Sequence, residues 1–216
     1  MASYKMKKKD DYMFKLEKNI SLILEKKENP KILELGVRHG LSTKFFLEYC
    51  EKNNGKLYSV DIDDCSNVSD SAKWKFIHSR DDDYDNIIKE TGRDFDLIYI
   101  DSFHDAKHVS KIIYMYFMDL KKNGHFFIDD ISWILYSKNN LRDNFNSEIN
   151  NHETFLEILN VLNINMDKIL VNFDFLSSGL CKIQKISDEN LLVSKKVLTR
   201  EYTLKNFIRK IVRLLN

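Results

Sequence analysis

The stretch Lys31-Ile-Leu-Glu-Leu-Gly36-Val-Arg-His-Gly40-Leu-Ser-Thr43 decides how the rest of the chain is interpreted. An apolar run ends at the first glycine, the second glycine follows four residues later, and apolar residues then recur at helical spacing. This pattern predicts a strand, a tight turn and a helix. Glycines in the turn let a ligand approach the backbone, and the helix N-terminus offers unpaired N–H groups. Many α/β proteins carry such a turn, so its meaning depends on the segments that follow.

Strands and helices alternate along the next hundred residues. Apolar runs predict strands at residues 57–61, 74–78, 95–101 and 125–130, and amphipathic patterns predict helices at 11–27, 84–90 and 106–122. We expect Asn123-Gly124 to end the last helix. The alternation favours a parallel sheet joined by right-handed crossovers.

The C-terminal part departs from this alternation. Residues 131–151 are polar and are expected to form a loop, and residues 152–162 a helix. Residues 168–176 and 180–185 predict two strands joined by a tight turn, hence an antiparallel hairpin. A basic amphipathic helix is expected over residues 198–215. We therefore divide the chain into an N-terminal basic arm and capping helix (1–29), a central α/β domain (30–186) and a C-terminal helix (187–216).

The composition is that of a soluble globular protein with one main domain, because 43% of the 216 residues are hydrophobic and 31% are charged. A net charge of +1 argues against a general nucleic-acid binder. No apolar run has membrane-spanning length, and no apolar segment follows the basic N-terminus as in a secretory signal. Three widely spaced cysteines suggest reduced thiols. We expect a cytoplasmic protein.

Acidic residues stand at the ends of the expected strands, where open α/β sheets bind ligands. Asp61 follows Gly36 by 25 residues (61 − 36), near the offset of roughly 20 residues typical of an acid that binds ribose hydroxyls. The alternative is that Asp61 only caps the following helix.

Three further acids, Asp101, Asp129 and Asp130, end two strands that we expect to be neighbours. Carboxylates gathered so closely repel one another unless a cation neutralises them, and Mg²⁺ prefers such oxygen ligands. The alternative is that they face solvent. His104 follows Asp101 by three residues and is our candidate general base. We assign no chemistry to the other histidines, although His39 lies within the glycine turn.

These residues resemble a known family. Glu34-Leu-Gly36-Val-Arg-His-Gly40-Leu-Ser42 is similar to the first motif of class I S-adenosylmethionine-dependent methyltransferases, E-x-G-x-x-x-G-x-S, and the terminal hairpin is typical of them. The resemblance spans residues 30–185 or so and implies a Rossmann-like, doubly wound seven-stranded sheet, mostly parallel with an antiparallel C-terminal hairpin strand. It also implies S-adenosylmethionine as cofactor. The cofactor-binding residues that it implies are Glu34, Gly36, Val37, Arg38, His39, Gly40, Ser42, Asp61, Ile62, Ser79, Arg80, Asp81 and Asp101.

Residues 95–105 and 123–130 resemble a narrower, metal-dependent branch, which includes macrolide sugar O-methyltransferases and cephalosporin hydroxylase-like proteins. This resemblance implies Mg²⁺ or another divalent cation at Asp101, Asp129 and Asp130, with His104 as base. It also implies an acceptor hydroxyl on a sugar, a glycan or a small metabolite. The chain departs from the family after the third strand, where Ser79-Arg80-Asp81 replaces Gly-Asp-Ser, and before the fifth, where Gly124-His125 replaces Gly-Gly.

Three alternatives remain open at this point. The first is a metal-independent small-molecule methyltransferase, and the second an NAD-dependent oxidoreductase, which the turn spacing and the hairpin disfavour. The third is a non-catalytic module that binds a partner through its basic tail, on an acidic membrane surface, against its own body or in a homo-oligomer formed by the terminal helices. Trp133 and Tyr136 either close over the acceptor or pack in the core.

Overall fold

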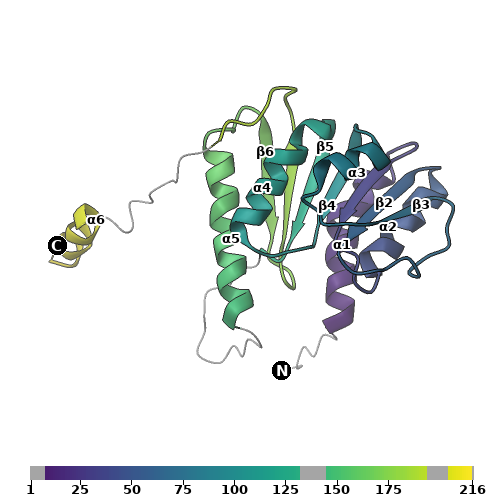
Figure 1. Ribbon diagram of the computed structural model, residues 1–216. Helices are drawn as coiled ribbons and strands as arrows, with labels where there is room; N and C mark the ends of the chain where they lie inside the picture. Colours follow the sequence, from purple (N-terminus) through teal and green to yellow (C-terminus); the bar gives the residue numbers. More distant parts are fainter. Residues whose placement is uncertain (1–7, 132–144, 194–203, 216) are drawn as a thin grey trace.

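A seven-stranded sheet forms the centre of the molecule (Figure 1). The computed structural model describes residues 8–131, 145–193 and 204–215. The strands are β1 (Lys31–Leu35), β2 (Lys56–Asp61), β3 (Trp74–His78), β4 (Phe95–Ile100), β5 (Leu120–Asp129), β6 (Ile169–Asp174) and β7 (Leu180–Lys185). They lie in the order β3-β2-β1-β4-β5-β7-β6, in which β7 is antiparallel to both neighbours and the other pairs are parallel. The expected Rossmann-like sheet with an antiparallel hairpin strand is confirmed.

Helices cover both faces of this sheet (Figure 1). On one face, α1 (Lys8–Leu24) and α2 (Leu41–Lys52) share an apolar core with Leu97 and Tyr99 of β4. On the other, α3 (Tyr84–Thr91), α4 (Ala106–Tyr116) and α5 (Phe145–Asn163) pack on Ile98 and Ile100 of the same strand. Successive β4 side chains point to opposite faces, and because both faces are covered every residue of this strand is buried.

The boundary between α4 and β5 differs from the sequence prediction. The helix ends at Tyr116 rather than near residue 122, a 3₁₀ turn η1 (Phe117–Asp119) follows, and β5 begins at Leu120. The β4–β5 register shifts after the Phe95↔Leu120 pair and resumes at Leu97↔His125, and Asn123 between them has a φ of 63°. Asn123-Gly124 therefore does mark a break in the regular backbone, but this break is an irregularity inside β5 and not the end of a helix.

The loop prediction also needs correction. Residues 145–151 belong to α5, which begins seven residues before the expected start at 152 (152 − 145). Trp133 and Tyr136 lie outside the described residues. The terminal helix α6 (Leu204–Leu215) stands apart from the sheet and its covering helices (Figure 1). In the described part of the chain, no helix combines the length and the apolar character needed to cross a membrane.

Candidate active site

The glycine turn follows β1 and packs against the backbone at the end of β4. Gly36 has a φ of +102°, and a Cβ atom there would lie 2.1 Å from the carbonyl oxygen of Asp101. The amide of Gly36 donates to Val60 O, and the amide of Asp101 donates to Leu35 O. No side chain fits at position 36, so the glycine lets the carboxyl ends of three strands meet.

Glu34, near the end of β1, stabilises this turn through hydrogen bonds. Its buried carboxylate accepts hydrogen bonds from Ser42 Oγ (2.6 Å), Thr43 Oγ1 (2.8 Å) and Ser59 Oγ (2.6 Å). Burial raises the pKa of Glu34 to about 7, although these hydroxyls oppose the shift. Glu34 and Ser42 are both among the cofactor-binding residues that the resemblance implies. Both are buried, and their hydrogen bond links β1 to the start of α2.

Asp61, at the end of β2, is bound to the same turn. Its Oδ2 accepts the backbone N–H groups of Val37 (2.7 Å) and Arg38 (3.0 Å), and its Oδ1 accepts that of Asp63 (3.0 Å). Burial opposes ionisation, but the backbone hydrogen bonds outweigh it and lower the pKa of Asp61. Asp61 is therefore an ionised carboxylate that shapes the turn and borders the cavity beside it.

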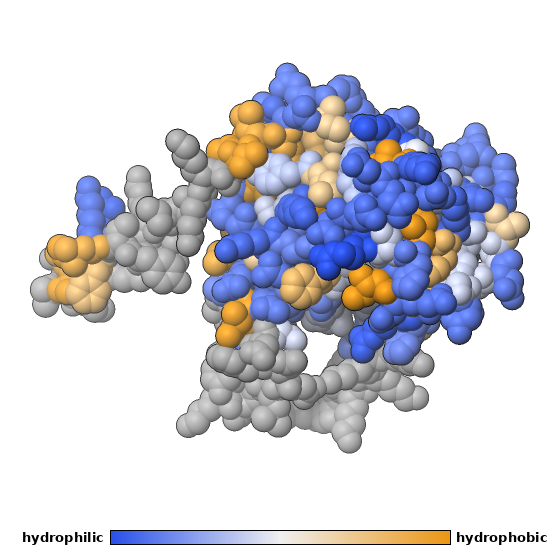
Figure 2. Space-filling model, viewed as in Figure 1, coloured by the Kyte–Doolittle hydropathy of each residue, from blue (hydrophilic) through white to orange (hydrophobic). Residues whose placement is uncertain are grey.

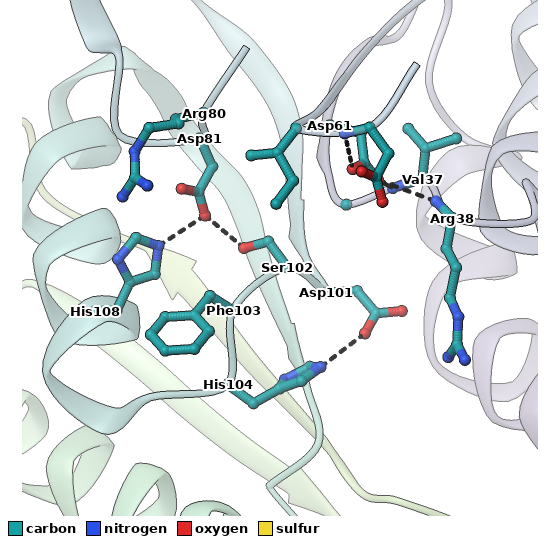
Figure 3. Close-up of a pocket in the computed structure, with 13 residues that line it drawn as sticks. Val37, Arg38, Asp61, Arg80, Asp81, Asp101, Ser102, Phe103, His104 and His108 are labelled. Atoms are coloured by element: carbon teal, nitrogen blue, oxygen red, sulfur yellow. Dashed lines mark hydrogen bonds and ion pairs between the residues drawn. The ribbon is translucent and has the colours of Figure 1, made fainter. Parts of the chain in front are cut away.

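This cavity has a volume of about 610 Å³ and opens beside the ends of β1, β2 and β4 (Figure 3). Its charged and titratable lining residues are four aspartates, two arginines and two histidines. The lining residues are Gly36, Val37, Arg38, Asp61, Ile62, Asp63, Arg80, Asp81, Asp101, Ser102, Phe103, His104 and His108.

Most of the expected cofactor residues border this cavity, and five do not. Those that do are Gly36, Val37, Arg38, Asp61, Ile62, Arg80, Asp81 and Asp101, and those that do not are Glu34, His39, Gly40, Ser42 and Ser79. Gly40 is needed for packing, because a Cβ there would lie 2.2 Å from Val68 Cγ1. His39 is exposed, and Ser79 donates to Asp83 instead.

One wall of the cavity is built around Asp81, which follows β3. Its Oδ2 accepts the hydroxyl of Ser102 at 2.5 Å and lies 2.8 Å from His108 Nε2 (Figure 3). A carboxylate only accepts hydrogen bonds, so Nε2 of His108 carries the proton in this contact. Both contacts use Oδ2, which leaves Oδ1 able to accept from a ligand. Neither Ser102 nor His108 was expected at the site, since neither belongs to the motif around residue 80.

Two exposed apolar side chains complete the cavity. Ile62 is 65% exposed and Phe103 is 66% exposed, although large apolar side chains such as these are usually buried. Phe103 also packs edge-on against His108, with ring centroids 5.5 Å apart. Exposed apolar groups at the border of a polar cavity are suited to the faces of a planar ligand ring.

At the opposite end of the cavity, His104 lies between two acids. Its Nε2 is 3.5 Å from Asp101 Oδ1 and 3.3 Å from Asp130 Oδ2, and Figure 3 shows the contact with Asp101. The pKa of Asp101 is raised well above the usual range by burial and by the charges of Asp129 and Asp130. The structure thus brings His104, Asp101 and Asp130 together, and Asp129 is close enough for its charge to act on Asp101.

Asp129 is engaged by a residue that the sequence analysis did not single out, Lys15 of α1. The Nζ of Lys15 is fully buried and pairs with Asp129 Oδ1, and it also donates to Ser178 Oγ at 2.7 Å. Oδ1 of Asp129 further accepts from Ser178 Oγ and from the amide of Asp130, and Oδ2 accepts the hydroxyl of Tyr99 at 2.7 Å. Both oxygens of Asp129 are occupied by groups of the chain itself.

This arrangement bears on the expected metal site. Within the described ranges, no cluster of three or more His, Cys, Asp or Glu side chains is placed to hold a metal ion. Asp101 and Asp130 retain partly exposed carboxylates beside His104 and fit a divalent cation. Asp129 does not fit as a third ligand while Lys15 holds it.

Comparisons with known proteins agree with this geometry. Residues 33–131 match a family model described as a methyltransferase domain. This match, the sheet order and the glycine turn are those expected from the resemblance to class I S-adenosylmethionine-dependent methyltransferases. No curated protein matches the sequence.

Solved structures share the fold at low identity. MycE methyltransferase of mycinamycin biosynthesis, in complex with Mg, S-adenosylhomocysteine (SAH) and mycinamycin VI, is 17% identical, with a TM-score of 0.58 over 93% of this chain and 54% of its own. A caffeoyl-CoA O-methyltransferase assigned in Staphylococcus aureus is 17% identical (TM-score 0.57, 81% of this chain, 83% of its own). An rRNA methylase assigned in Clostridium thermocellum is 16% identical (TM-score 0.59, 81% and 97%). The present chain spans about half the length of MycE.

Proposed function

We propose that this protein transfers the methyl group of S-adenosylmethionine to a hydroxyl oxygen of a small acceptor that carries a sugar or a similar polyol. The observation that carries the proposal is that one cavity is bordered both by the glycine turn with Asp61 and by His104 between two acids. A cofactor cavity and a proton-accepting group meet there, at the carboxyl ends of the central strands. MycE, whose structure contains mycinamycin VI, supports the choice of acceptor class.

In this proposal the methionine part of the cofactor lies against the turn at Gly36, and its ribose lies near Asp61. The adenine ring lies between the exposed side chains of Ile62 and Phe103, and its amino group donates to Asp81. The four aspartates of the lining suit a ligand with a positively charged sulfonium and a positively charged amino group.

His104 is the proposed base. The acceptor oxygen attacks the methyl carbon, the carbon–sulfur bond breaks with its electrons going to sulfur, and the hydroxyl proton passes to the imidazole. Because Nε2 faces Asp101 and Asp130, it is the protonated nitrogen at rest, and Nδ1 accepts the proton. The negative charge of this acidic cluster then stabilises the imidazolium that forms.

A divalent cation has a place in this scheme at Asp101 and Asp130, which are the residues that would hold it. Bound there, it would supply a lowered pKa for the acceptor hydroxyl. A second, metal-independent form of the same reaction is favoured by Lys15, whose ammonium already neutralises Asp129. The two forms differ in their response to chelation.

The test is an assay of SAH release with a panel of sugar-bearing acceptors, catechols and polyols. We expect release to depend on a hydroxyl acceptor, and His104→Gln to lower kcat by a factor of about 10² to 10⁴ with little change in KM. The matched control is His39→Gln, because His39 is exposed and does not border the cavity. Equal kcat values for the two variants would refute His104 as base, and loss of turnover in EDTA would select the metal-assisted form.

A further inference from the structure

The terminal helix α6 presents two chemically distinct faces. Leu204, Ile208 and Ile211 stand at i, i+4 and i+7 and share one face, which Phe207 and Val212 widen. These five apolar side chains are between 43% and 76% exposed, so described residues of the chain leave this face uncovered. Figure 2 shows its orange surface on one side of the helix.

The opposite face is basic. Lys205, Arg209 and Arg213 stand at i, i+4 and i+8, and all three are exposed. The sequence Leu204–Leu215 contains four basic residues and no acidic one. In Figure 2 the blue part of this helix lies above its orange part. The polar face therefore carries charge of one sign only.

From this pairing of faces we propose that α6 lies in the surface of an anionic lipid bilayer. A helix in the bilayer interface buries its apolar side chains at the boundary of the acyl chains and keeps its basic side chains among the headgroups. Each basic residue near an anionic surface contributes further attraction. The occupant of the apolar face is thus a lipid surface with negative headgroups.

Charge distinguishes this occupant from a second copy of the chain. Two α6 helices packed through their apolar faces would bring basic flanks together, with no acid in either helix to pair with them. An anionic bilayer meets the apolar face and the basic flanks at once. The proposal is separate from methyl transfer, because no residue of α6 borders the cavity.

The experiment is co-sedimentation of the full chain with phosphatidylcholine vesicles and with vesicles in which about a third of the lipid is phosphatidylglycerol. We expect binding to the anionic vesicles, weak binding to the neutral ones, and a decrease as salt is raised. Arg209→Glu with Arg213→Glu should weaken anionic binding by at least about fivefold per position. Lys44→Glu with Lys89→Glu changes the net charge equally at exposed residues of α2 and α3 and should leave binding nearly unchanged.

A second pair tests the apolar face. Phe207→Ser with Ile211→Ser keeps the charge of α6 and should also release the protein from anionic vesicles. Equal binding of all variants, or no binding by the unaltered chain, would overturn the proposal. If the unaltered chain forms a dimer that Phe207→Ser with Ile211→Ser dissociates, and does not bind vesicles, the occupant is a second copy. SAH binding is expected to be unaffected in every variant.

Discussion

The buried pair between Lys15 and Asp129 allows a quantitative prediction. Lys15→Met keeps most of the side-chain volume and removes the ammonium, which leaves the Asp129 carboxylate inside the protein. Removing one partner of a buried ion pair generally destabilises by about 3–5 kcal/mol. Asp129 keeps the hydroxyls of Tyr99 and Ser178 and the amide of Asp130, so we expect the lower end, about 3 kcal/mol. For a chain of this length that corresponds to roughly 6–12 °C in Tm.

Calorimetry of two variants on the same helix measures the effect. Lys18→Met is the matched control, because Lys18 pairs with Asp174 at 2.8 Å while remaining 52% exposed. An exposed pair of this kind contributes less than about 1 kcal/mol. The double variant Lys15→Met with Asp129→Asn should recover much of the loss, since it removes the uncompensated charge.

The same variant tests the relation between Lys15 and a metal. With the ammonium removed, Asp129 becomes available beside Asp101 and Asp130, and we expect Mn²⁺ to bind Lys15→Met at least about tenfold more tightly than the unaltered chain. Isothermal titration measures this affinity. If Lys15→Met is no less stable than Lys18→Met, or if its Mn²⁺ affinity is unchanged, the view that Lys15 occupies the place of a cation at Asp129 is wrong.

Three further predictions concern the cofactor half of the site. Gly36→Ala should abolish SAH binding, because its Cβ would overlap the Asp101 carbonyl, whereas Gly92→Ala, where the nearest atom is 3.4 Å away, should retain it; equal affinities would contradict the role of the turn. As pH rises from about 4.5 to 7, the unaltered chain should lose folding stability, and Glu34→Gln should not show this loss. The pKa of Glu34 is raised in the folded chain. Its contribution to the free energy of unfolding is therefore complete below the pKa of the unfolded chain and is lost as pH rises through about 7. Urea titrations at a series of pH values should show a loss on the order of 3 kcal/mol. Asp81→Asn should lower the affinity for SAH by a larger factor than the affinity for an SAH analogue that has a carbonyl in place of the adenine amino group. An equal loss of affinity for the two ligands would refute the adenine contact.

The features that sequence alone could predict are those set by local chemistry. Positions 36 and 40 have positive φ angles and close contacts, which only glycine accommodates well. Such positions can be recognised from the sequence as glycines within a strand–turn–helix pattern. Asp61 was predicted to border the ligand site because strand ends meet at one edge of a parallel sheet. The structure adds that it holds the turn through two backbone amides.

Contacts between distant segments could not be predicted in this way. Lys15 and Asp129 are 114 residues apart, and a lysine on an amphipathic helix is ordinarily assigned to solvent. His108 reaches Asp81 only because α4 lies against the loop that follows β3. The early start of α5 was missed because residues 145–151 are mainly polar and show no clear apolar period.

The most direct test of the account is the position of SAH in a crystal structure of the complex. We predict that it occupies the cavity beside Gly36, with its ribose at Asp61, its adenine between Ile62 and Phe103, and its sulfur facing the side of the cavity that carries His104. SAH bound elsewhere, or bound with its sulfur turned away from His104, would contradict the claim that the cofactor and the proposed base act at one cavity.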